Sequence, residues 1–209
     1  MVAAVAHYRT RVLAVIVALV SVMAGGSAAA EEVVDHVVAV VGQDVISRYD
    51  VVAAWWIQGR PPVAPAELVD ELIDRRVLVA EGMRFGLQEE GKASVTETQV
   101  RAMVDAVGAQ GGAVAASSAR RWLEDEATIT AYRRVRVDPF VRVAHAAVRA
   151  TFDAAGDAYA GRRFFEVEGE IRQRLLDEAR RQRLSELLAD LRGKVAIRRP
   201  PAELPLRLE

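Results

Sequence analysis

Apolar residues recur at helical spacing through most of this chain, and this pattern restricts the possible folds more than any other feature. The clearest case begins at Pro65, because proline suits the first turn of a helix, where its missing N–H would have no partner. Gly86 can end the same helix in a left-handed conformation. The apolar positions between them follow at helical spacing: Leu68, Leu72, Ile73, Val77, Ala80 and Met83.

Capping signals place further helices along the chain. Ser47 with Asp50, and Thr96 with Gln99, have the spacing of capping boxes. Asp138 followed by Pro139 predicts another helix start. The predicted helices cover residues 47–59, 96–107, 120–137, 139–152 and 166–192, with a flexible break over 108–118. The last of them would be about 40 Å long at 1.5 Å per residue.

Two short segments have the composition of β-strands. Residues 37–41 are β-branched or small, 42–44 have turn chemistry, and the apolar run resumes at 45–46, which predicts a hairpin. Residues 195–197 form a second strand candidate after the long helix. The predicted fold class is therefore mainly α: a multi-helix domain with a small β-hairpin, and a long C-terminal helix followed by a short strand.

The first thirty residues have the pattern of a secretory signal peptide. Arg9 and Arg11 precede an apolar stretch of about 13 residues, which is too short for a bilayer-spanning helix of roughly 20. Ala28 and Ala30 place small residues where a signal peptidase cuts. We therefore expect export to a Gram-negative periplasm, and a soluble protein with no stable membrane insertion after cleavage.

Cleavage would leave 209 − 30 = 179 residues, enough for one domain with a proper core. We divide the chain into a signal peptide at 1–30, a domain at 31–198 and a tail at 199–209 that we expect to be disordered. The chain contains no cysteine, which excludes disulfides and thiol chemistry.

Charge is unevenly divided between the two halves of the domain. Residues 31–119 contain 7 basic and 14 acidic residues, a net charge of −7, whereas residues 120–199 contain 18 basic and 13 acidic residues, a net charge of +5. A basic excess can indicate nucleic-acid binding, but export argues against that partner. We expect instead that the two halves pack together with complementary charges.

Patterns typical of catalysis are missing from the sequence. There is no G-x-S-x-G motif of a serine hydrolase. His36 and His145 are the only histidines after residue 30, and neither has the spacing of a metal ligand. Glu166, Glu168 and Glu170 would spread around a helix axis rather than form a carboxylate pair. We therefore predict no catalytic residue, no metal site and no cofactor.

Several segments resemble, in the same order, the N-terminal domain of the SurA-type periplasmic chaperones. Residues 37–47, which read VVAVVGQDVIS, resemble the opening of that domain, except that Gly42 stands where the family usually has Asn. Residues 72–78 and 95–100 resemble its next two helices. The stretch 171–197 resembles the helix and strand that return to complete the domain, so the likeness covers most of residues 33–198.

The resemblance also shows what this chain lacks. Members of the family carry parvulin-type prolyl isomerase domains before the returning C-terminal helix. Here only 11 residues, Asp153 to Arg163, separate Phe152 from Phe164, so no such domain fits. The resemblance therefore implies the chaperone module without the isomerase.

Trp55 and Trp56 are the most suggestive candidates for a binding surface. Neighbours on a helix point about 100° apart, so one ring can enter the core while the other stays exposed. Either both rings contribute to packing, or they form an aromatic surface for unfolded segments. The predicted peptide-contacting residues are Trp55, Trp56, Met83, Met103, Trp122 and Phe140.

These observations favour a noncatalytic periplasmic holdase that binds unfolded polypeptides, such as outer-membrane proteins, through an apolar groove. Two alternatives stay open. One is a foldase related to the peptidyl-prolyl cis-trans isomerases, which would accelerate proline isomerisation. The other is an envelope scaffolding protein that binds one defined partner.

Overall fold

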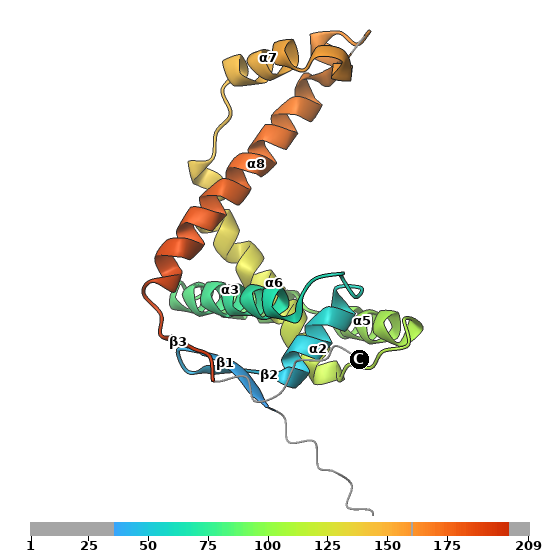
Figure 1. The fold of residues 1–209 in the computed structure, drawn as a ribbon, viewed down its shortest axis with the longest axis vertical. Coiled ribbons are helices and arrows are strands. Elements are labelled where there is room, and N and C mark those ends of the chain that lie inside the picture. The colour runs from blue at the N-terminus through green and yellow to red at the C-terminus, as the bar shows by residue number, and fades with distance from the viewer. Residues whose placement is uncertain (1–35, 160, 201–209) are drawn as a thin grey trace, which may run out of the picture. The chain divides into compact units, whose positions relative to one another are not determined.

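The computed structural model describes residues 36–159 and 161–200. The predicted signal peptide, 1–30, lies outside the described residues, and so does the predicted tail from residue 201 onward. The described part of the chain is mainly helical with a small antiparallel sheet (Figure 1), and its long C-terminal helix is followed by a short strand. The predicted fold class is thus confirmed.

The sheet joins the two ends of the described chain. Strands β1 (Val37–Val41) and β2 (Asp44–Ser47) form the predicted hairpin, with Gly42 in the turn at φ 62°. Strand β3 (Ile197–Arg198) pairs antiparallel with the other side of β1, which gives the order β2-β1-β3. The Gly42 N–H also donates to the carbonyl of Ala196 at 2.8 Å. The last strand therefore completes the sheet, although it covers residues 197–198 and not the predicted 195–197.

Local capping signals place the first two helices. Helix α2 (Arg48–Ile57) starts at the predicted capping box, in which Ser47 Oγ accepts from the Asp50 N–H at 3.2 Å and Asp50 Oδ2 accepts from the Ser47 N–H at 2.9 Å. Helix α3 (Pro65–Arg84) begins at the predicted proline, and Gly86 follows it at φ 72°. Both helices match their predicted ranges closely.

Helix α4 (Gln88–Ser94) is absent from the sequence prediction. Gly91 lies in its interior, and a glycine there disfavours a helix by about 1 kcal/mol relative to alanine. Gly91 is nevertheless the buried residue of α4, because it lies directly against Thr128. Close packing against a neighbouring helix thus outweighs the local preference. Helix α5 (Glu97–Ala109) then starts at the predicted Thr96 cap.

Helix α6 (Ala116–Arg136) begins earlier than predicted, because the glycine-rich segment before it is held in place. Gly112 packs against the ring of Trp56, and the Ala115 N–H donates to the Tyr49 hydroxyl at 3.0 Å. On α6, Ile129 and Tyr132 are buried and Trp122 and Leu123 are half-buried, whereas Val135 is 43% exposed.

The predicted helix over 139–152 is wrong in its first part. Residues Asp138–Phe140 form a 3-10 turn, η1, closed by a hydrogen bond from the Phe140 N–H to the Val137 carbonyl at 3.0 Å. Val141 is then extended at φ −108°, and helix α7 (His145–Ala154) starts only after it. The proline begins a helical turn, but the β-branched residue that follows favours extended backbone and ends it.

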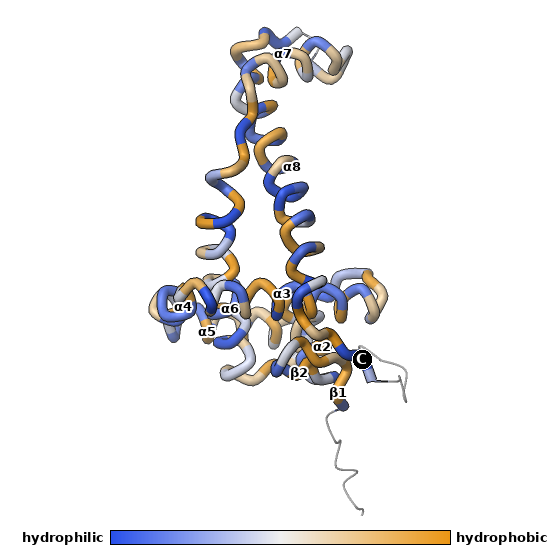
Figure 2. Tube along the Cα trace, turned by 90° about the vertical axis from the view of Figure 1, so that its left-hand side faces the viewer, coloured by the Kyte–Doolittle hydropathy of each residue, from blue (hydrophilic) through white to orange (hydrophobic). Residues whose placement is uncertain are grey.

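Helix α8 (Phe164–Arg192) follows a second 3-10 turn, η2 (Gly156–Tyr159), and matches the predicted long helix. At its start the Arg163 N–H donates to the Glu166 carboxylate at 2.9 Å. Hydrophobic and hydrophilic positions alternate along α8 (Figure 2).

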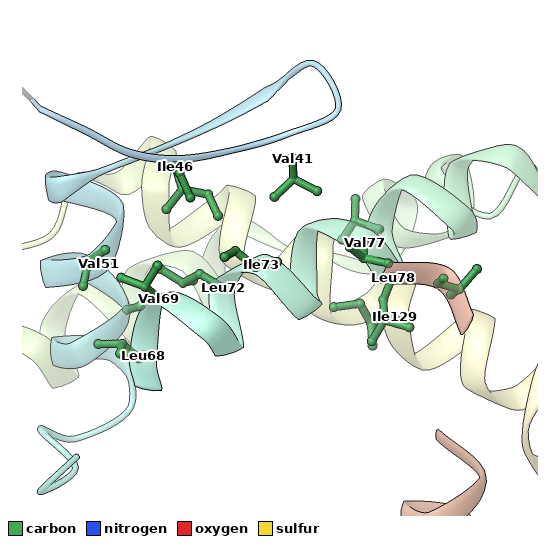
Figure 3. Close-up of a cluster of buried hydrophobic side chains, with 14 of the residues drawn as sticks. Val41, Ile46, Val51, Leu68, Val69, Leu72, Ile73, Val77, Leu78 and Ile129 are labelled. Carbon is green, nitrogen blue, oxygen red and sulfur yellow. The ribbon is translucent and has the colours of Figure 1, made fainter. Parts of the chain in front are cut away.

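Three hydrophobic clusters hold these elements together. The main cluster joins the sheet, α2, α3, α6 and the C-terminal part of α8, and Figure 3 shows Ile46, Leu72 and Ile129 among its residues. A second cluster joins α2, α5 and the start of α6 around Val100 and Val107. A third joins α7, η2 and the N-terminal part of α8. Helix α8 therefore contributes to two separate clusters at its opposite ends.

Ion pairs connect the acidic and basic halves of the sequence, in agreement with the predicted charge complementarity. Arg192 Nε lies 2.5 Å from Asp74 Oδ1, and Arg199 pairs with Asp70. Arg192 also pairs with Asp70, Glu90 pairs with Arg134, and Glu97 pairs with Arg120. The C-terminal end of α8 and the residue after β3 are thereby attached to α3.

Candidate binding cleft

The most promising site among the described residues is a cleft between α3, α6 and α8, with a volume of about 370 Å³. Each helix contributes the residues near its C-terminal end. The floor consists of Phe85, Tyr132, Leu187 and Leu191, and the rim consists of the charged residues Glu81, Arg84, Arg136, Asp190 and Lys194, so that most of the accessible surface of the cleft is polar.

Phe85 is the apolar side chain most open to a ligand in this cleft. It caps α3 immediately before Gly86, and its side chain remains 47% exposed. Its ring lies 5.7 Å from the ring of Tyr132, which is a favourable distance for an aromatic pair. The α3 end therefore positions an exposed ring against a buried one.

Tyr132 forms the deepest part of the floor. Its side chain is almost fully buried, and burial is the largest cause that raises the pKa of its hydroxyl above 10.0. The charge of Glu81 raises this pKa further, while Arg136 lowers it by its charge and by a hydrogen bond to the hydroxyl. The tyrosine therefore stays neutral at physiological pH.

The opposite wall is the C-terminal part of α8. Leu191 is buried and Leu187 is half-buried, and both pack against the main cluster. Arg192 holds this end of α8 on α3, because it pairs with Asp74 and also donates to the Asp70 carbonyl at 3.2 Å. The wall is thus anchored to the body of the fold.

Charged side chains on the rim are largely paired within their own segments. Arg84 Nη1 lies 2.8 Å from Glu81 Oε1, and Lys194 Nζ lies 2.5 Å from Asp190 Oδ2. The guanidinium of Arg136 lies 5.2 Å from the centroid of the Phe85 ring, within cation–π distance. The rim therefore contains two ion pairs and one further positive charge, that of Arg136.

The predicted tryptophans lie elsewhere and take part in packing. Trp55 packs against the main cluster and donates to the Pro61 carbonyl at 3.2 Å, whereas Trp56 packs against the second cluster. Their rings are 5.2 Å apart in an edge-on arrangement. The guanidinium of Arg60 lies 5.9 Å from the Trp55 ring centroid and 5.1 Å from the Trp56 centroid. Both rings are half-buried, so packing accounts for most of their surface.

The other four predicted contact residues are not gathered at one site. Trp122 is half-buried, and the Arg75 guanidinium lies 3.8 Å from the centroid of the Trp122 ring. Met103 packs in the second cluster. Met83 and Phe140 are exposed, at 43% and 63%. Phe140 lies near Arg183 of α8, at 5.9 Å. None of the six predicted residues lines the cleft between α3, α6 and α8.

A second cavity among the described residues, of about 330 Å³, lies between α4, α5 and α6, and its accessible lining is mostly apolar. In this lining Glu90 pairs with Arg134, and Glu126 pairs with Arg75. No group of three or more histidine, cysteine, aspartate or glutamate side chains among these residues is placed to hold a metal ion. Nor is any helix in this part of the chain both long and apolar enough to cross a membrane.

No protein-family model matches this chain, and no curated protein sequence matches it either. Its function must therefore be inferred from its own sequence and from the geometry of the cleft.

Proposed function

We propose that this chain is a noncatalytic chaperone module that holds apolar segments of unfolded polypeptides in the cleft between α3, α6 and α8. The observation that carries this proposal is the half-exposed ring of Phe85, which lines the cleft together with Tyr132 and Leu187. Ligand pockets measure about 300–1,000 Å³. At about 370 Å³, this cleft suits one or two side chains of an extended segment.

Weak binding is the expected mode of action. Burial of apolar surface is worth roughly 25 cal/mol per Å², and the ordering of client and side chains offsets part of this gain. A small cleft of this kind can hold a segment briefly and release it without any covalent step. Such reversible contacts would keep an unfolded chain from aggregating while still allowing it to fold.

The sequence supports a location and a client class for this activity. The signal-peptide pattern of residues 1–30 and the resemblance to SurA-type chaperones both favour the periplasm. Unfolded outer-membrane proteins would then be natural clients, since they cross that compartment with their apolar surface exposed.

Aggregation of an unfolded outer-membrane porin tests the proposal directly. The purified chain without residues 1–30 should reduce light scattering when the porin is diluted from denaturant. Phe85→Ala should weaken this effect. Phe165→Ala is the matched control, because Phe165 is 65% exposed at the start of α8 and does not line the cleft.

Failure to reduce scattering at severalfold excess would contradict the proposal, and so would equal losses in the two variants. Capture of bound proteins from a periplasmic extract distinguishes the holdase from the scaffolding alternative. A scaffolding protein would capture a single stoichiometric partner, whereas a holdase would capture many unfolded clients. The foldase alternative predicts faster cis–trans exchange in a proline-containing peptide, whereas a holdase leaves that rate at its background value.

A further inference from the structure

We infer that the cleft prefers apolar segments that carry a carboxylate beside the bound side chain, and that Arg136 recognises this carboxylate. The inference rests on the proposed function, because it requires a polypeptide in the cleft. It adds a rule of client selection that an apolar floor alone would not impose.

The balance of charges around the cleft supports this choice. Two carboxylates, Glu81 and Asp190, line it, and each already pairs with a cation of its own segment, Arg84 or Lys194. Arg136 is the third cation of the lining. No carboxylate of the described residues forms an ion pair with it, so one positive charge of the rim is left for a ligand.

Arg136 is also held where a ligand would meet it. Its guanidinium lies over the Phe85 ring at 5.2 Å from the centroid. A guanidinium has five N–H donors, so stacking on a ring leaves donors for a carboxylate. A client side chain against Phe85 would place its neighbouring residue next to Arg136.

The expected preference is modest. Arg136 is exposed and lies at the last residue of α6, where the negative end of the helix dipole offsets part of its charge. Exposed ion pairs of this kind change a binding constant by about threefold, and salt reduces the effect.

Three fluorescent peptides of identical apolar sequence, with Glu, Gln or Lys beside the central aromatic residue, test the inference by anisotropy. The Glu peptide should bind about threefold more tightly than the Gln peptide at low salt, and the Lys peptide more weakly than either. Arg136→Gln should remove this order. Arg134→Gln is the matched control, because Arg134 is also in the last turn of α6 but pairs with Glu90 outside the cleft.

The possible outcomes separate this inference from the function on which it rests. Equal binding of the three peptides to the unaltered chain would overturn the inference and leave peptide holding intact. The same loss of Glu preference in both variants would also overturn it, since the effect would then come from general charge. Binding of none of the peptides would contradict the proposed function itself.

Discussion

Replacing Gly82 with alanine should destabilise the fold, although alanine is the better helix former. Gly82 lies inside α3 and is buried against α6. A Cβ atom at this position would lie 2.6 Å from Thr128 Cγ2, whereas its next contacts, the Thr128 carbonyl and Tyr132 Cβ, are at ordinary distances of 3.6 and 3.9 Å. The conflict therefore involves a single methyl group.

The magnitude follows from opposing terms. Carbon atoms pack best at about 3.5–4.0 Å, so the two helices or the Thr128 side chain must move by about 1 Å. Overpacking of this kind costs about 1–3 kcal/mol. Because alanine favours a helix over glycine by up to about 1 kcal/mol, the substitution also stabilises α3 and offsets part of this cost. We expect Gly82→Ala to lower the free energy of unfolding by about 1–2 kcal/mol.

Urea unfolding followed by circular dichroism measures this change, and a double-mutant cycle identifies its cause. Thr128→Ser removes the methyl group but keeps the hydroxyl, which donates to the Glu124 carbonyl at 2.9 Å. In that background Gly82→Ala should be close to neutral. Gly108→Ala in α5 is the control, because a Cβ there meets nothing within 4 Å and should stabilise the helix. If Gly82→Ala stabilised the protein as Gly108→Ala does, or if Thr128→Ser did not rescue it, the reasoning would be refuted.

Three further predictions concern other parts of the fold. Ser47→Ala removes the side-chain cap of α2 and should cost about 1 kcal/mol in urea unfolding, while an unchanged midpoint would contradict the role of the cap. Gly112→Ala should shift the tryptophan emission spectrum, because a Cβ there would lie 2.5 Å from Trp56 Cε3; an unaltered spectrum would count against this contact. Burial raises the folded-state pKa of Asp125 above 3.8, despite the nearby Arg76, so the folded state binds its proton more tightly than the unfolded state does. The contribution of this carboxyl to stability should thus fall as pH rises from 3.8 through the raised pKa, and Asp125→Asn should remove that slope from urea titrations over the same range.

Much of the helical framework could be predicted because its signals are local. The Ser47 and Thr96 capping boxes need only residues three positions apart, and both occur as expected. Pro65 and Gly86 mark the two ends of α3 for equally local reasons, proline by its fixed φ and glycine by its positive φ. Such features depend on the backbone of a few residues and not on the rest of the fold.

The errors occur where distant residues decide the local structure. Helix α4 forms around Gly91, a residue that favours a break by itself, because the glycine allows α6 to approach closely at Thr128. The reverse happens after Pro139, where a strong start signal gives only one turn. The first outcome depends on what α6 offers for packing, whereas the second follows from the β-branched Val141, whose preference for extended backbone outweighs the start signal.

The cleft lies beyond sequence reasoning for the same reason. Its walls come from 81–85, 132–136 and 187–194, which are far apart in the chain and meet only because α6 and α8 both pack against α3. Tryptophans and methionines stand out in the sequence by their size, but large apolar side chains also fill cores. What distinguishes Phe85 is its place at the end of a helix, where the chain turns away at Gly86 and leaves the ring half covered. A half-covered ring at a helix end, close to a second helix end, is therefore the more informative feature to seek in chains of this kind.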